Sequence, residues 1–89
     1  VSEFGFMNSF SIYPNPSNGS FTINSPVIPT KEVSIHAKVY DVLGRVVHQE
    51  VLQFSNNEAV LKLNLQSASY IIELQDEAGN VQRERIVIE

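Results

Sequence analysis

The stretch EVSIHAKVYDVLGRVVHQEVLQF, residues Glu32–Phe54, holds the clearest structural signal of this 89-residue chain. In its first nine residues, apolar and polar side chains alternate. One face of the resulting strand would carry Val33, Ile35, Ala37 and Val39. Because successive side chains of a β-strand point to opposite faces, the alternation predicts a strand over 32–40 whose apolar face lines the core. A second strand is predicted directly afterwards, over 46–54.

The residues between these two strands predict a tight hairpin turn. Asp41 can accept hydrogen bonds from backbone N–H groups two residues further on. Gly44 can adopt the left-handed conformation that a three- or four-residue hairpin loop requires. Taken alone, Arg45 is interpreted as a solvated residue that flanks the turn.

Alternation of this kind recurs along the chain, whereas no window carries a clear helical period. Seven strands are predicted: Ser9–Tyr13, Ser20–Asn24, Glu32–Tyr40, Val46–Phe54, Ala59–Leu65, Tyr70–Asp76 and Val81–Ile88. Seven short strands separated by turns are typical of an all-β, Ig-like antiparallel β-sandwich, with a small barrel as the alternative. The segment SPVIPT (25–30) contains two prolines and is predicted to cross from one sheet to the other.

The later strands have predictable core faces. Further core residues are expected at Leu61, Leu63, Leu65, Tyr70, Ile72 and Leu74. In the last strand, Ile86 and Ile88 share a face with Gln82 and Glu84, which predicts either a bulge or a strand whose first half is solvated.

The stretch YPNPSNGSF (13–21) is the least ordinary part of the sequence. Pro14 and Pro16 restrict both themselves and Asn15, so we expect a stiff, extended segment that Gly19 helps to reverse. A proline has no N–H, which places the segment at a sheet edge. It is interpreted either as a rigid corner that blunts an edge strand or as a recognition surface.

Composition excludes several classes of function. The formal charge is −4 with six Lys and Arg, so nucleic acid is not an expected partner. There is no Cys for a disulfide and no apolar run long enough to cross a bilayer. Because the chain does not begin with Met, we expect it to be a piece of a longer protein, with residues 1–8 as a linker and 9–89 as one domain.

Candidate catalytic and metal-binding residues are sparse. His36 and His48 lie on separate predicted strands without carboxylates at metal-ligand spacing, and Ser34, His36 and Asp41 lack a nucleophile elbow. The loop from Asp76 to Asn80 lacks the ligand spacing of a calcium loop and is predicted to be a hairpin turn. We therefore expect no enzymatic activity, no cofactor and no metal.

In order along the chain, "YPNPSNGSFTI", "VYDVLGRVV" and "YIIELQDEAGNVQRERIVIE" resemble the three motifs of the C-terminal sorting domain of the type IX secretion system. The resemblance covers residues 10 to 89. The residues that match its motifs are Pro14, Asn15, Pro16, Gly19, Asp41, Gly44, Arg45, Tyr70 and Gly79. Two positions depart from the family: Ala68 stands where a glycine is usual, and the chain ends at Glu89, where a basic residue is frequent.

The resemblance implies an Ig-like domain that acts as an address label for a cargo protein fused upstream. The cargo would pass through the periplasm, and an outer-membrane translocon and its shuttle would recognise the folded domain and deliver the cargo to the cell surface or the medium. A sortase would commonly remove the domain, which is its substrate. An unpaired edge strand predicts weak homodimerisation of the isolated domain. The alternative function is a carbohydrate-binding or adhesion module of a cell-surface protein.

Overall fold

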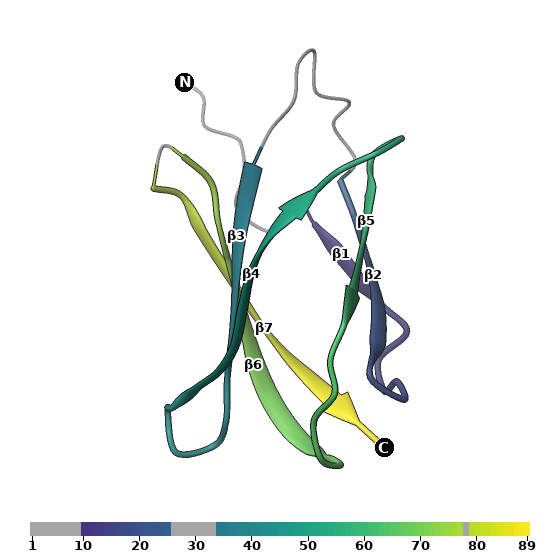
Figure 1. Cartoon of the computed structure of the whole chain (residues 1–89), viewed down its shortest axis with the longest axis vertical. Coiled ribbons are helices and arrows are strands. Elements are labelled where there is room, and N and C mark those ends of the chain that lie inside the picture. The colour runs from purple at the N-terminus through teal and green to yellow at the C-terminus, as the bar shows by residue number, and fades with distance from the viewer. Residues whose placement is uncertain (1–9, 26–33, 78) are drawn as a thin grey trace.

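The computed structural model describes residues 10–25, 34–77 and 79–89, and these residues form two antiparallel sheets (Figure 1). The strands are β1 (Ser11–Tyr13), β2 (Ser20–Asn24), β3 (Ser34–Tyr40), β4 (Val46–Gln53), β5 (Glu58–Lys62), β6 (Ala68–Gln75) and β7 (Val81–Ile88). One sheet has the order β1-β2-β5 and the other the order β4-β3-β6-β7. This arrangement confirms the predicted seven-stranded β-sandwich. None of the described residues forms a helix that could cross a membrane.

The core lies between the two sheets and follows the alternation of the sequence. Its buried members are Phe21, Ile23, Ile35, Ala37, Val39, Leu52, Ala59, Leu61, Leu63, Tyr70, Ile72, Leu74, Ile86 and Ile88. The predicted core faces are thus confirmed, except that Leu65 is only partly buried and packs at the margin. Burial of a large aliphatic or aromatic side chain stabilises a fold by about 1.5–3 kcal/mol, so this shared core holds the two sheets together.

A tyrosine anchors the connection between β5 and β6. The Tyr70 hydroxyl donates a hydrogen bond of 2.7 Å to the carbonyl oxygen of Gln66, four residues upstream, while its ring is buried. This arrangement is the tyrosine corner found in Ig-like sandwiches, where it secures a chain that passes from one sheet to the other. Here β5 and β6 belong to different sheets, so the contact holds the crossing in place.

The structure corrects the prediction for the last strand. The pairing of β6 with β7 is continuous from Ala68↔Ile88 to Gln75↔Val81, so the predicted bulge is wrong. The alternative, a solvated first half, is correct for the exposed Glu84 and wrong for Gln82. Gln82 is buried, and two hydrogen bonds compensate for the loss of water. Its Oε1 accepts from the N–H of Phe10 at 3.2 Å, and its Nε2 donates to the carbonyl of Phe10 at 3.0 Å. A bulge occurs instead in the β3–β4 pair, where the register shifts between Val39 and Tyr40.

Several strand ends also differ from the prediction. β5 ends at Lys62 rather than Leu65, although the N–H of Leu63 still donates to the carbonyl of Gly19 at 2.7 Å, one position beyond the last β2–β5 pair. β1 begins at Ser11. The predicted linker 1–8, the core position of Val33 and most of the predicted crossover 25–30 lie outside the described residues. The crossing itself is evident, since β2 and β3 belong to different sheets.

Candidate recognition surface

The chain bends between β1 and β2 instead of extending. Residues 14–16 form bends, and the peptide bonds before Pro14 and Pro16 are both cis. Because residues 14–16 form bends, the predicted extended segment is wrong. Pro14, Asn15 and Pro16 are all exposed at this corner.

The corner closes the free edge of β7. Asn15 Nδ2 donates to the carbonyl oxygen of Arg85 at 2.9 Å, and the N–H of Val87 donates to Asn15 Oδ1 at 3.0 Å. The backbone of Ser17 continues the pattern, donating to the carbonyl of Val87 at 3.0 Å and accepting from the N–H of Glu89 at 2.8 Å. The side chain of Asn15 thus replaces a strand residue, and the corner blunts an edge strand of the opposite sheet.

Gly19 is required where the corner enters β2. Its φ is +116°, and a Cβ at this position would lie 2.6 Å from the carbonyl oxygen of Leu63. The buried Ser17 hydroxyl accepts from the N–H of Gly19 at 2.9 Å and donates to the carbonyl of Ser20 at 2.6 Å. Steric exclusion and hydrogen bonding together fix this turn.

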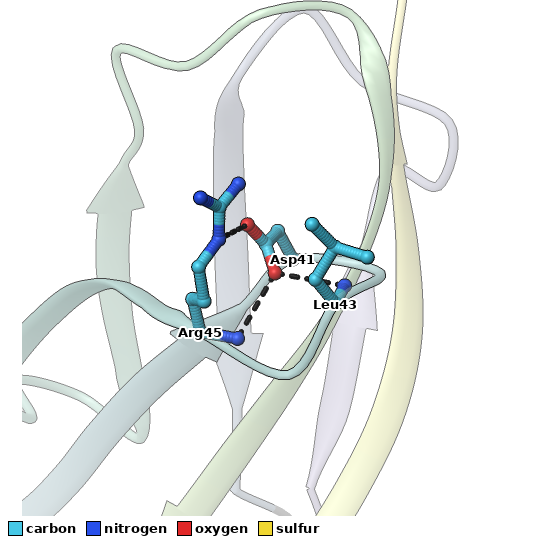
Figure 2. Close-up of polar contacts among 3 residues, drawn as sticks. All are labelled: Asp41, Leu43 and Arg45. Atoms are coloured by element: carbon cyan, nitrogen blue, oxygen red, sulfur yellow. Dashed lines mark hydrogen bonds and ion pairs between the residues drawn. The ribbon is translucent and has the colours of Figure 1, made fainter.

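The side chain of Asp41 organises the turn between β3 and β4 (Figure 2). Its Oδ1 accepts from the N–H groups of Leu43 and Arg45, both at 2.9 Å, and its Oδ2 accepts from Arg45 Nε at 2.8 Å. The N–H of Gly44 donates to the Asp41 carbonyl at 3.0 Å, with φ of +84° at the glycine. Arg45 is therefore part of the turn, although its side chain remains 71% exposed.

These contacts change the acidity of Asp41. The hydrogen bond from the N–H of Arg45 is the largest cause that holds the pKa of the carboxyl below its ordinary value of 3.8. The Arg45 side chain and the N–H of Leu43 act in the same direction, while partial desolvation opposes them. The carboxylate is thus the form that the turn requires.

A second turn, between β6 and β7, has three hydrogen bonds that match those of the first turn. The N–H of Asn80 donates to Asp76 Oδ1 and its side-chain amide donates to Asp76 Oδ2, both at 2.9 Å. The N–H of Gly79 donates to the carbonyl of Asp76 at 3.2 Å, with φ of +94° at the glycine. Both turns therefore share the pattern Asp-x-x-Gly followed by a residue whose side chain donates to the aspartate.

The two turns differ in the residues between the aspartate and the glycine. Val42 and Leu43 are 79% and 73% exposed in the first turn, whereas the second has Glu77 and Ala78 in the sequence. Beside Val42 lies an open pocket of about 340 Å³, lined by Asp41, Val42, Ser69, Tyr70, Ile71 and Arg85. Since the second turn forms without these apolar residues, turn geometry does not account for Val42 and Leu43.

Comparison with protein families decides the identity of this fold. The model of the secretion system C-terminal sorting domain matches residues 11–89. The chain belongs to this family. The sorting domain is the C-terminal signal for type IX secretion, so sorting is its function rather than the carbohydrate-binding alternative. No curated protein sequence matches the chain.

The sorting domain does not bring all the motif residues together. The turn that contains Gly44 and the C-terminal end of β7 lie at the lower end of the sandwich, whereas the turn that contains Gly79 lies at the upper end (Figure 1). Tyr70 is buried and serves the β5–β6 crossing. Ala68 starts β6 in a regular pair with Ile88, so this position does not need a glycine here.

Arg85 connects the corner with the β3–β4 turn, and sequence reasoning missed it. Its carbonyl accepts from Asn15, and its side chain lines the pocket that contains Asp41 and Val42. Arg85 Nη2 also lies 3.5 Å from Ser69 Oγ. The sequence held no signal for the neighbours of this residue.

The residues considered for catalysis lie apart in the sorting domain. Ser34 begins β3 and Asp41 follows its last residue, so roughly 23 Å of strand separates them. His48 pairs with Glu50 at 2.7 Å instead. Within the described ranges, no group of three or more His, Cys, Asp and Glu side chains could hold a metal ion.

Proposed function

We propose that the type IX machinery recognises this sorting domain through a docking face formed by the corner 14–19, the turn 41–45 and the first residues of β6. The observation that carries the proposal is the exposure of Val42 and Leu43 at the tip of a hydrogen-bonded turn. Neighbouring exposed apolar side chains that the fold does not need are characteristic of an interaction site.

The chemistry of the docking face indicates the kind of receptor surface that fits it. Val46 and Val47 continue the exposed apolar surface beyond the turn. Arg45 stands beside it with one N–H engaged by Asp41 and the rest of a highly exposed guanidinium available. A receptor with an apolar recess and an adjacent carboxylate would complement both features.

The docking face is also pre-organised. Three hydrogen bonds from Leu43 and Arg45 hold the Asp41 side chain, and two hydrogen bonds to β7 hold Asn15. Little conformational entropy is therefore lost when a receptor binds, and a rigid surface gains affinity in this way. The motif residues Asp41, Gly44, Asn15 and Gly19 act by holding this shape.

The proposed route follows from the sorting function. Residues 1–8 link a cargo upstream to the domain 9–89, and the folded domain travels with the cargo through the periplasm. The outer-membrane translocon and its shuttle bind the docking face, the cargo emerges at the cell surface or in the medium, and a sortase removes the domain. The domain is a substrate without cofactor or catalytic role.

The function is tested by fusing residues 9–89 to a periplasm-directed fluorescent reporter in matched strains with and without a working type IX machine. We expect delivery to the surface or medium only in the competent strain, with a mass loss that corresponds to removal of the domain. Retention of a folded, intact fusion in the periplasm of both strains would contradict the proposed route.

The docking face is tested by exchanging the residues of the two turns. The variant V42E/L43A places the Glu-Ala of the second turn in the first, where the same hydrogen bonds can form. We expect it to retain the wild-type melting temperature and to lose delivery of the reporter. The reciprocal variant E77V/A78L is the matched control and should be delivered normally. Normal delivery of V42E/L43A would rule out the docking face while leaving the sorting function intact.

A further inference from the structure

The outer edge of β4 differs from the other strand edges of the described residues. β4 has eight residues, pairs with β3 alone, and contains no proline. By contrast, β1 has three residues and is followed by Pro14, and β7 is closed by Asn15 and Ser17. β5 has five residues and charged ends, Glu58 and Lys62. A long, uncovered edge strand is a template for pairing with another strand.

The sequence of β4 is complementary to itself when reversed. In an antiparallel pair with Gln49 opposite Gln49 of a second copy, His48 would lie opposite Glu50 and Val47 opposite Val51. Val47 and Val51 are 36% and 44% exposed, so this contact would remove apolar surface from water. Pairs of opposite charge and of β-branched residues are both favourable across antiparallel strands.

The in-chain register of β4 is regular from His48 to Gln53, and the β3–β4 bulge lies at Val47, at the N-terminal margin of the proposed contact. His48 pairs with Val39 and Glu50 with Ala37, two buried residues, so the side chains of His48 and Glu50 share the face of the sheet that is turned toward the core side. His48 Nε2 already lies 2.7 Å from Glu50 Oε1 in one chain. A second copy would extend this hydrogen-bonded pair into a cluster of two histidines and two glutamates.

We propose that this sorting domain forms a homodimer by antiparallel pairing of β4 with β4 of a second copy, with Gln49 at the two-fold axis. The two four-stranded sheets then form one continuous sheet of eight strands, and the contact is the same for both copies. The second copy is the occupant because the register places His48 opposite Glu50 and Val47 opposite Val51 of the same sequence. The homodimer rests on the edge of β4 and not on the proposed docking face, whose adjoining apolar surface shares Val47 with it.

Cysteine cross-linking tests the register, since the chain has no native Cys. Gln49→Cys places two thiols directly opposite each other, and oxidised glutathione should convert them to a disulfide-linked dimer of twice the 10.0 kDa chain. Gln53→Cys is the matched control: the residue is exposed on the same strand, but the proposed register separates its two copies by roughly 26 Å. We expect the linked dimer from Gln49→Cys and monomer from Gln53→Cys.

Charge exchange provides a second test without cross-linking. H48E places a glutamate opposite Glu50 of the second copy, and E50K places a lysine opposite His48, so each variant alone should sediment as a monomer. An equimolar mixture places the new glutamate opposite the new lysine and restores His48 opposite Glu50, so it should sediment as a heterodimer. A wild-type chain that stays at 10.0 kDa at millimolar concentration, a mixture that stays monomeric, or equal cross-linking at positions 49 and 53 would each overturn the proposal.

Discussion

At the scale of single residues, Gly19 of the corner and Gly44 of the β3–β4 turn have different physical roles. Gly19 combines a positive φ with a backbone oxygen 2.6 Å from the position of an added Cβ. Gly44 has a positive φ of +84°, but an added Cβ would meet nothing within 4 Å. Position 19 therefore excludes a side chain for two reasons and position 44 for one.

We expect Gly19→Ala to lower the free energy of unfolding more than Gly44→Ala does. The left-handed conformation costs an alanine about 1–2 kcal/mol at either position. Overpacking against the Leu63 carbonyl adds about 1–3 kcal/mol at position 19 alone. Urea unfolding of both variants measures the difference. Equal losses in the free energy of unfolding would show that the Leu63 carbonyl moves away from the added Cβ without penalty.

Asp41 makes the stability dependent on pH. Its pKa in the folded domain is lower than the ordinary 3.8, so its contribution is fully present above that value and is lost as the pH falls through the folded pKa. We expect Asp41→Asn to unfold at a lower urea concentration than the wild type at pH 7, and the gap to narrow between about pH 4 and pH 2. A gap that stays constant over this range would mean that the carboxylate charge does not support the turn.

At the scale of elements, the corner between β1 and β2 acts on a strand about 70 residues further along the chain. Asn15 bonds the backbone of β7 on both sides of Ile86, and Ser17 bonds it again at Val87 and Glu89. The corner thereby joins the edge of one sheet to the edge of the other. A motif that resembles a local turn in sequence is a long-range connection in the folded domain.

We expect Asn15→Ala to expose the end of β7. Loss of two side-chain hydrogen bonds should cost about 1 kcal/mol each or less at this exposed position and accelerate hydrogen exchange at the Val87 N–H. Asn18→Ala is the control, because Asn18 lies in the same corner but, among the described residues, makes no contact with β7 that corresponds to those of Asn15. Its side chain accepts from the N–H of Ser20, two residues further on, at 3.3 Å. If the hydrogen-exchange rate of the Val87 N–H is unchanged in Asn15→Ala, Asn15 does not protect this edge.

At the scale of the whole molecule, one core serves both sheets. Phe21, Ile23 and Leu61 of the smaller sheet pack with Ile35, Ile72 and Ile86 of the larger one, and all six are buried. Neither sheet could keep its apolar face covered if the other unfolded. The domain should therefore unfold as one cooperative unit.

Cooperative unfolding predicts that different probes give the same transition. Tyr13 belongs to the smaller sheet, and Tyr40 and Tyr70 belong to the larger one, so tyrosine-resolved NMR can follow each sheet separately. We expect the urea midpoints of all three to coincide with the midpoint of far-ultraviolet circular dichroism. A separate transition at Tyr13 would show that the smaller sheet detaches first.

Much of this architecture could be predicted from the chain alone. Alternation places Ile35, Ala37 and Val39 in the core because a strand has a side-chain period of two, and this rule needs no knowledge of neighbours. The turn at Asp41 and Gly44 is equally local, since its hydrogen bonds join residues at most four positions apart. The sequence by itself therefore determined the strands, the inward faces and the hairpin turns.

The partners of the remaining polar residues depended on the tertiary structure. Gln82 is hydrogen-bonded to the backbone of Phe10, 72 positions away. The side chain of Asn15 is hydrogen-bonded to the backbone of Arg85 and Val87. The sequence predicted a solvated or bulged strand and an extended corner, because the alternation rule contains no information on contacts between distant segments. Only the closing of the sandwich brought these backbone groups within hydrogen-bonding distance, and buried or edge-strand polar groups require such partners.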